Sequence, residues 1–171
     1  MRQNSGQPSE AGTYQDAEAA CLWLQGRGFE PRRIIAFGES LGGGVVSELA
    51  LRQPLGGLVL QSTFTSIPDV GAELFPWMPV HWLSTIHYDT HRRLPRLKLP
   101  VLVMHSRADG LIPFHHAEKN YAVANSPKLF CELQGGHNDS LAHPEAFVAG
   151  LERFLRLVES PQTGARQDSV A

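Results

Sequence analysis

Three side chains of the types that form a catalytic triad occur in the order serine, aspartate, histidine. Ser40 is the centre of GESLG (38–42), Asp109 lies in SRADG (106–110) and His137 lies in GGHND (135–139). A serine hydroxyl becomes a useful nucleophile when a histidine takes its proton and a carboxylate orients that histidine and stabilises its charge. Together the three residues would support acyl transfer through a covalent serine intermediate.

The surroundings of Ser40 predict a sharp turn between a strand and a helix. An apolar run at 34–37 precedes it, and a helix-forming stretch follows it. Gly-x-Ser-x-Gly in this context is the pattern of a nucleophile elbow: the glycines at 38 and 42 allow strand and helix to approach, and the strained turn pushes Oγ outward. The pentapeptide also recurs by chance, so the argument depends on the other two residues.

The rest of the chain predicts alternating strands and helices. We expect strands at 33–37, 57–61, 101–105 and 128–133, and helices at 14–25, from the elbow to about 53, at 115–124 and at 144–158, the last with an inward face of Phe147, Leu151, Phe154, Leu155 and Val158. Strand, helix, strand in this order requires parallel pairing, and parallel strands end on one common rim. Asp109 and His137 each follow a strand, so we expect both to meet Ser40 at that rim.

The pattern predicts one domain with a loose segment at each end. Residues 1–12 are expected to be a flexible N-terminal segment, 13–159 the domain, and 160–171, which are nearly devoid of apolar residues, a disordered tail. Within the domain, 63–100 interleaves aromatic residues with prolines. We expect an irregular insertion there, serving either as a lid or acyl pocket or as plain core.

Composition argues against several classes of function. The 171 residues carry a formal charge of −2 with no basic patch for nucleic acid. The first residues are too polar for a signal peptide, and no apolar run reaches the roughly 18 residues of a membrane span, so we expect a cytoplasmic chain without a membrane segment; a longer product could still carry an anchor. Cys21 and Cys131 are expected to be buried thiols.

No cofactor and no metal are expected. His87 and His91 stand four residues apart, but the glutamate of a His-Glu-x-x-His motif is missing. The remaining histidines outside the proposed triad are assigned to the surface or the core.

These motifs resemble those of the α/β-hydrolase superfamily. Segments 38–43, 109–113 and 135–139 are similar to abhydrolase-domain serine hydrolases that include protein depalmitoylases and their bacterial relatives. The likeness spans nearly the whole ordered chain. One departure is Ser106, where that family usually has glycine in a His-Gly-x-x-Asp run.

The resemblance implies a serine hydrolase of the carboxylesterase or acyl-thioesterase type. It would cleave an ester, thioester or amide of an acyl or other small-molecule substrate, and the backbone N–H of Leu41 would stabilise the oxyanion. Asp69, after the strand at 57–61, is the alternative acid, whereas Asp139 is too close to His137 along the chain to reach its ring from behind. Two other functions stay open: a non-catalytic or partner-dependent fragment, and a serine peptidase of the same fold.

The resemblance also implies that the chain corresponds to the C-terminal portion of the fold. In that family four more strands precede the elbow, whereas here one helix does. We therefore expect an α/β architecture with about four strands in a mostly parallel sheet and helices on both faces. Strand 33–37 would then be an exposed edge, open to a missing N-terminal half or to self-association, and the oxyanion hole would lack its second donor.

Overall fold

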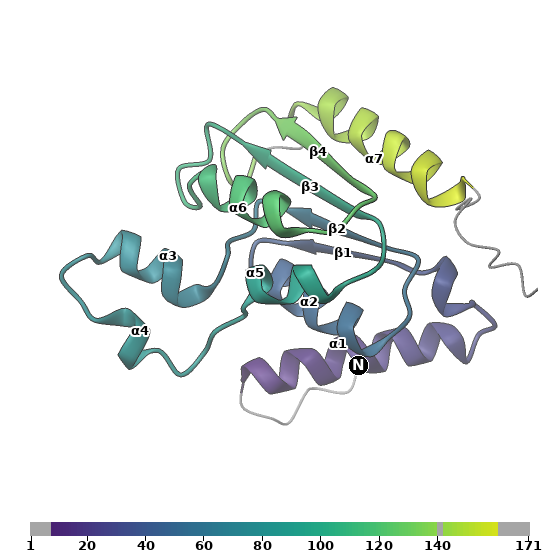
Figure 1. Ribbon diagram of the computed structural model, residues 1–171, viewed down its shortest axis with the longest axis horizontal. Coiled ribbons are helices and arrows are strands. Elements are labelled where there is room, and N and C mark those ends of the chain that lie inside the picture. The colour runs from purple at the N-terminus through teal and green to yellow at the C-terminus, as the bar shows by residue number, and fades with distance from the viewer. Residues whose placement is uncertain (1–7, 140–141, 161–171) are drawn as a thin grey trace, which may run out of the picture.

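The structure is a computed structural model that describes residues 8–139 and 142–160. A four-stranded, all-parallel sheet in the order β1-β2-β3-β4 lies at its centre, with helices on both faces (Figure 1). The strands are β1 Ile35–Glu39, β2 Gly57–Gln61, β3 Val101–Ser106 and β4 Lys128–Leu133. The helices are α1 Glu10–Gln25, α2 Leu41–Arg52, α3 Ile67–Leu74, α4 Val80–Leu83, α5 Thr90–Arg93, α6 His115–Val123 and α7 Pro144–Glu159, with 3-10 turns at Pro31–Arg33 and Leu94–Arg96. The predicted fold class is confirmed.

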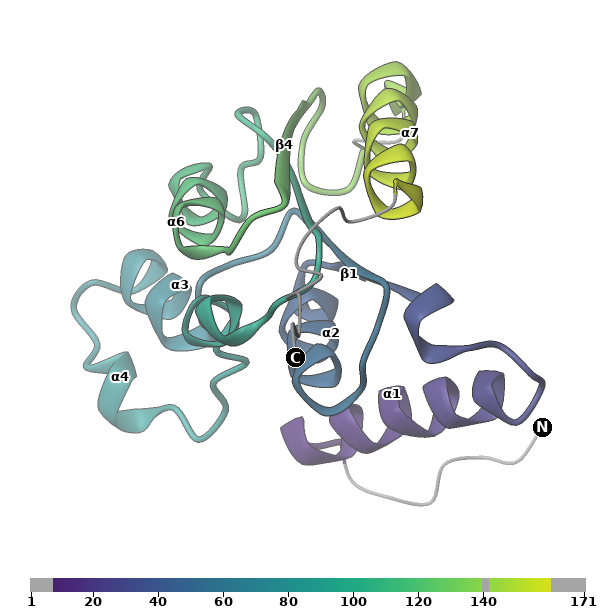
Figure 2. The ribbon, with the colours of Figure 1, turned by 45° about the vertical axis from the view of Figure 1, so that its right-hand side comes forward.

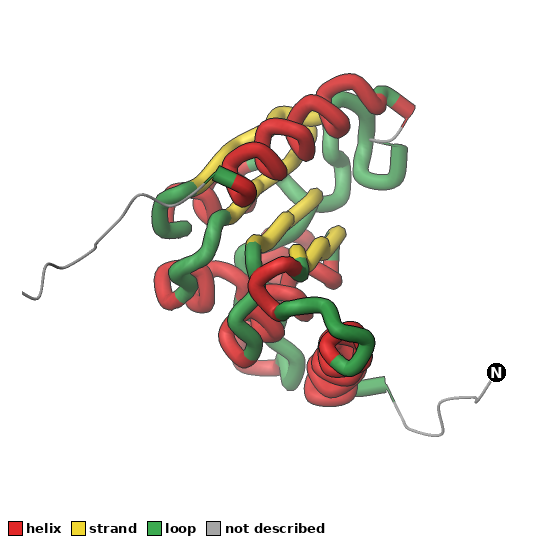
Figure 3. The backbone as a smooth tube through the Cα atoms, turned by 90° about the vertical axis from the view of Figure 1, so that its right-hand side faces the viewer, coloured by secondary structure: helices red, strands yellow, loops and turns green. Residues whose placement is uncertain are grey.

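Side-chain alternation along the two central strands builds a core on each face of the sheet. One face of β2 and β3 packs against α2 and α6, with α1 lying outside α2 (Figure 2), and this core contains Leu58, Leu60, Val101, Val103, Leu49, Ala50, Ala117 and Cys21. The opposite face packs against α7 (Figure 3), through Val59, Leu102, Met104 and Phe154. Burial of each large aliphatic side chain contributes about 1.5–3 kcal/mol. The central strands are therefore firmly fixed, and so is the rim where they end.

The first helix begins earlier than the sequence predicts. It starts at Glu10, and the Ser9 hydroxyl caps it by accepting a hydrogen bond from the Gly12 N–H at 3.0 Å. The Glu10 carboxylate also accepts hydrogen bonds from the backbone N–H groups of His87 and Tyr88, at 2.6 and 2.9 Å. Because these contacts come from distant residues, the expectation that residues up to 12 are loose was wrong for Glu10 and its two successors.

Two further details differ from the sequence pattern. The first strand begins at Ile35 because the preceding residues form a 3-10 turn at Pro31–Arg33. Leu155 does not face inward from α7: it is 44% exposed, and Leu157 packs into the core instead. Cys21 is buried as expected, whereas Cys131 is partly buried, and both are free thiols.

The segment between β2 and β3 was expected to be either a lid or acyl pocket or plain core, and it has both buried and exposed parts. Phe64, Tyr88 and Leu94 are buried. Trp77 and Trp82, in the outer part around α3 and α4, are 76% and 91% exposed. The insertion is thus core where it meets the sheet and open where it projects from it (Figure 1).

Some expectations concern residues outside the described ranges. These include residues 1–7 and 161–171, so the tail expected from 160 onward is described only at Ser160. Within the described ranges, no helix has the length and apolar character needed to cross a membrane.

Candidate active site

Ser40 occupies a strained turn between β1 and α2. Its backbone has φ 51° and ψ −119°; a positive φ is unfavourable for a residue with a side chain and persists where the surroundings enforce it. The surroundings here are hydrogen bonds: the Ser40 N–H donates to the Gln61 carbonyl at 2.9 Å, and the Thr63 hydroxyl donates to the Ser40 carbonyl at 2.6 Å. The turn is thus fixed by residues at the end of the neighbouring strand.

Two glycines make this turn possible, and one of them is not the glycine that the motif suggests. A Cβ on Gly38 would lie 2.4 Å from the Gly42 carbonyl oxygen, so strand and helix could not approach. A Cβ on Gly43 would lie 2.3 Å from the Thr63 hydroxyl, whereas one on Gly42 would meet nothing within 4 Å. The close approach therefore depends on Gly38 and Gly43, and the expected role of Gly42 as a spacer was wrong.

Asp109 lies in the loop after β3 with its carboxylate buried. One oxygen, Oδ1, accepts hydrogen bonds from the backbone N–H groups of Leu111 and Ile112 at 2.9 and 2.8 Å. The other, Oδ2, lies 2.8 Å from Nδ1 of His137. Both oxygens are thus held, and one is directed at the imidazole.

His137 connects the two other predicted residues. Its Nδ1 faces Asp109, and its Nε2 lies 3.0 Å from the Ser40 Oγ. The Nδ1–H donates to the carboxylate, which leaves Nε2 to accept the serine proton. The structure brings Ser40, Asp109 and His137 together at the rim where β1, β3 and β4 end.

The alternative acid lies elsewhere. Asp69 is in the first turn of α3, where its carboxylate accepts a hydrogen bond from the Thr65 hydroxyl at 2.6 Å and faces His81 at 3.9 Å. Burial alone would raise the pKa of Asp69, but hydrogen bonds from Thr65 and Ser66 and the nearby His81 and His116 lower it overall. Its partners come from the insertion, and the acid position next to His137 is taken by Asp109.

Comparison with known proteins agrees with the observed fold. An uncharacterized protein of Mycobacterium tuberculosis is 41% identical over 155 residues, covering 89% of this chain and 55% of that protein. The alpha/beta hydrolase domain-containing protein WAV2 of Arabidopsis thaliana is 31% identical over 172 residues, covering 90% and 54%. A thermophilic esterase from Thermogutta terrifontis shares the fold with a TM-score of 0.66 at 18% identity, covering 92% of this chain and 75% of that one. No family model matches the chain.

The chain has the α/β-hydrolase fold, and it is similar in sequence to an alpha/beta hydrolase domain-containing protein. It spans about half the length of the curated relatives it matches.

Two residues of this α/β-hydrolase site were not singled out from the sequence. Thr63, which holds the Ser40 carbonyl, follows β2 at the same rim. His105 is fully buried four residues before Asp109; its Nε2 donates to the Ile112 carbonyl at 2.9 Å and lies 3.4 Å from the Asp109 carboxylate. Burial lowers the pKa of His105, so the ring is neutral. The sequence signal that could have identified His105 is its place in an apolar strand four residues before Asp109.

Leu41 is the first residue of α2. Its backbone N–H therefore belongs to the first turn of a helix that starts beside Ser40, where unpaired N–H groups and the helix dipole favour negative charge. This position agrees with the oxyanion role that the resemblance implies.

A second group of chemically active side chains lies apart from Ser40. Glu73, His115 and His116 each offer one atom able to bind a metal ion, and these atoms lie within 4.8 Å of one another. Both histidines were expected at the surface or in the core by default, and Glu73 lies 42 residues before His115 in the chain.

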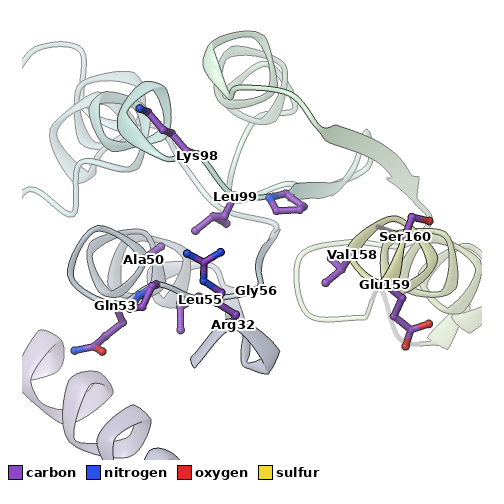
Figure 4. A pocket seen from close by; sticks show the side chains of 12 residues that line it. Arg32, Ala50, Gln53, Leu55, Gly56, Lys98, Leu99, Val158, Glu159 and Ser160 are labelled. Atoms are coloured by element: carbon purple, nitrogen blue, oxygen red, sulfur yellow. The ribbon is translucent and has the colours of Figure 1, made fainter. Parts of the chain in front are cut away.

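A separate cavity of about 540 Å³ lies at the other end of the sheet (Figure 4). It is lined by residues that precede β1, β2 and β3, among them Arg32, Gly56 and Pro100, and by the end of α7. Since Ser40 and its partners lie at the carboxyl ends of the strands, this cavity is not part of their site.

Proposed function

We propose that this protein is a serine hydrolase that cleaves carboxylic esters or thioesters through an acyl-enzyme intermediate. One observation carries the proposal: hydrogen-bond contacts of 2.8 and 3.0 Å connect Asp109 to His137 and His137 to Ser40. The serine lies in a strained turn. Such an arrangement combines a nucleophile, a base and a group that orients the base.

The proposed reaction follows from the position of each atom. Nε2 of His137 takes the proton as the Ser40 Oγ attacks the substrate carbonyl, and the Asp109 carboxylate stabilises the resulting imidazolium. The Leu41 N–H and the start of α2 stabilise the negative oxygen of the tetrahedral intermediate. His137 then gives the proton to the leaving group, and water releases the acyl group by the same steps.

An acyl substrate is supported by the place of the insertion. Tyr88, from the insertion, lies against α2, where a Cβ on Gly44 would come within 2.6 Å of it. The exposed Trp77 and Trp82 belong to the same segment. Exposed apolar side chains on a segment that packs against the helix after Ser40 would suit an aliphatic or aromatic acyl chain. The esterase with the same fold supports ester chemistry.

A fluorophosphonate probe tests the proposal, because it reacts with a serine that has a working base. Ser62 offers a matched control: it also has a positive φ, of 47°, and it directly follows the neighbouring strand β2. We expect covalent labelling of the unmodified chain and of Ser62→Ala, and none of Ser40→Ala. Equal labelling of both variants would refute the assignment of Ser40.

A second candidate function is a hydrolase half that acts only with additional chain. Two observations favour it: in the described part of the chain β1 lies at the edge of the sheet with Phe37 43% exposed, and the matched region covers only 55% of the Mycobacterium tuberculosis relative. An oxyanion hole also normally has two donors, and loss of one costs about 10²–10³ in turnover.

Turnover of a p-nitrophenyl ester separates the two candidates. We expect a chain extended upstream by roughly 100 residues, the length of four strands and their connections, to be faster and more stable than the chain as given. A monomer with equal turnover, established by size-exclusion chromatography and kinetics, would refute the second candidate.

A further inference from the structure

Three side chains of metal-binding types come together where α3 and α6 lie near each other in Figures 1 and 2. Glu73 comes from the last turn of α3, and His115 and His116 begin α6. The Glu73 Oε1 lies 2.8 Å from Nε2 of His115 and 3.5 Å from Nε2 of His116. Two imidazoles therefore face one carboxylate oxygen.

His116 shows that this group is more than a surface ion pair. Its side chain is fully buried, and its Nε2 has no hydrogen-bond partner among the described residues. A buried polar nitrogen without a partner costs about 1–3 kcal/mol, so its presence needs an explanation. The nitrogen is directed toward Glu73, where a bound ion would satisfy it.

The other side of the His116 ring has the support typical of a metal ligand. Nδ1 lies 2.9 Å from the Thr65 hydroxyl, and that hydroxyl donates to the Asp69 carboxylate at 2.6 Å. Metal-binding histidines usually direct their second nitrogen to a carboxylate or another acceptor, which fixes the ring and makes it a stronger ligand. Here a hydroxyl relays that interaction.

The Thr65 backbone N–H also lies 3.2 Å from Nδ1 of His116. In the tautomer that accepts this bond, Nε2 carries the proton and meets Glu73 at a long 3.5 Å. In the other tautomer, Nδ1–H donates to the Thr65 hydroxyl and the Nε2 lone pair is free to bind an ion.

We propose that Glu73, His115 and His116 bind a divalent transition-metal ion, with Zn²⁺ as the best-suited ion, and that this ion ties α3 to α6. Two imidazoles and a carboxylate form a ligand set that Zn²⁺ commonly uses with one position left open. With bonds of about 2.0–2.2 Å, tetrahedral ligand atoms lie about 3.3 Å apart. The 3.5 Å pair already has this separation, and the half-exposed His115 side chain needs to move to complete the site.

Glu73 also lines a neighbouring hollow of about 420 Å³. Glu73 shares its lining with Asp69, His81, His91 and Lys119. The Lys119 charge opposes cation binding, and the carboxylates of Glu73 and Asp69 favour it. The hollow is thus lined by one positively charged side chain and two carboxylates, and this excess of negative charge favours a cation.

The test is titration of the metal-free 171-residue chain with Zn²⁺ by calorimetry, with Mg²⁺ as the hard-cation comparison. We expect one Zn²⁺ per chain and no Mg²⁺ binding, because imidazole ligands favour Zn²⁺. Glu73→Gln and His115→Gln should each weaken binding by more than the 10–100-fold typical of losing an outer partner. Both side chains are more than one-third exposed, so the fold should tolerate these changes.

His81→Gln is the matched control, since His81 lines the same hollow outside the three-residue group. It should bind Zn²⁺ as the unmodified chain does. Co²⁺ adds a spectroscopic readout: the absorption of a four-coordinate ion should appear in the unmodified chain and disappear in Glu73→Gln. Zn²⁺ affinity that is equal in all variants, or lost equally in His81→Gln, would overturn the proposal.

Discussion

Two histidines near the ends of the strands share one arrangement and differ in what they face. His137 bonds directly to the Asp109 carboxylate through Nδ1, and His116 reaches the Asp69 carboxylate through the Thr65 hydroxyl. On the other ring nitrogen, His137 meets a serine hydroxyl, whereas His116 meets a carboxylate.

The comparison shows that an oriented imidazole has no fixed function. A carboxylate behind the ring helps to orient it in both cases, directly at His137 and through the Thr65 hydroxyl at His116. The group that faces the other ring nitrogen then selects the chemistry. A hydroxyl can give its proton to the ring, so the ring acts as a base. A carboxylate and the ring nitrogen together form two ligands suited to a cation. The first arrangement supports catalysis, and the second supports the proposed ion.

The largest expected effect removes the hydroxyl or the base. Ser40→Ala and His137→Ala should each lower ester turnover by about 10⁶, and the double variant should be scarcely slower than either, because triad members act as one unit. Steady-state kinetics with a p-nitrophenyl ester, on whichever form of the chain is active, measures this. Losses that multiply would show that the two residues act separately.

The carboxylates come next. Asp109→Asn should lower turnover by about 10⁴, because His137 would lose its tautomer and the stabilisation of its charge. Asp69→Asn should leave turnover unchanged, since Asp69 serves the other histidine. The same kinetics compare the two, with circular dichroism to confirm that each variant folds. The opposite ranking would move the acid to Asp69.

A smaller effect distinguishes two threonines. Thr63→Val removes the hydrogen bond to the Ser40 carbonyl, and a bond worth about 1 kcal/mol predicts roughly fivefold slower turnover. Thr65→Val should not change turnover but should weaken Zn²⁺ binding by about 10–100-fold. Equal effects of both variants on both measurements would mean that the two sites are not separate.

The smallest effect is on stability and concerns His105. Burial lowers its pKa, so the unfolded chain takes up a proton below about pH 6.5 that the folded chain does not. The free energy of unfolding should therefore fall as the pH falls through that value, with His105 contributing at most about 1.4 kcal/mol per pH unit. The Asp109 carboxylate and the Ile112 carbonyl oppose this shift, and the His137 ring adds to it.

His105→Gln should flatten this dependence while keeping a donor for the Ile112 carbonyl. Urea unfolding at about pH 7.5 and about pH 5.5 measures it, and His116 should contribute a slope of the same sign, because burial lowers its pKa too. An unchanged slope in His105→Gln would show that this ring is protonated in the folded state.

The sequence predicts most of the surroundings of His137. Strand periodicity places β2 and β4 at their observed bounds, and parallel strands bring their ends to one rim whatever the details of the loops. Ser40, Asp109 and His137 each follow a strand, so their meeting needs no further information.

The surroundings of His116 could not be predicted from the sequence. Glu73 lies in α3, inside an insertion whose path depends on packing of irregular segments, and no periodic pattern relates it to α6. The start of α1 was missed for the same reason, since Glu10 is held by backbone groups 77 and 78 residues away. Contacts made by insertions need the three-dimensional structure.

The open edge of β1 has a consequence for how such a protein could be controlled. Ser40 directly follows this strand, and β1 pairs with β2 in the described part of the sheet. A polypeptide that adds itself along β1 would carry its own end to within a few residues of the nucleophile. Whatever occupies the edge would therefore also shape the entrance for substrate. A designed peptide that pairs with β1 would then act on the reaction at Ser40 from the edge of the sheet.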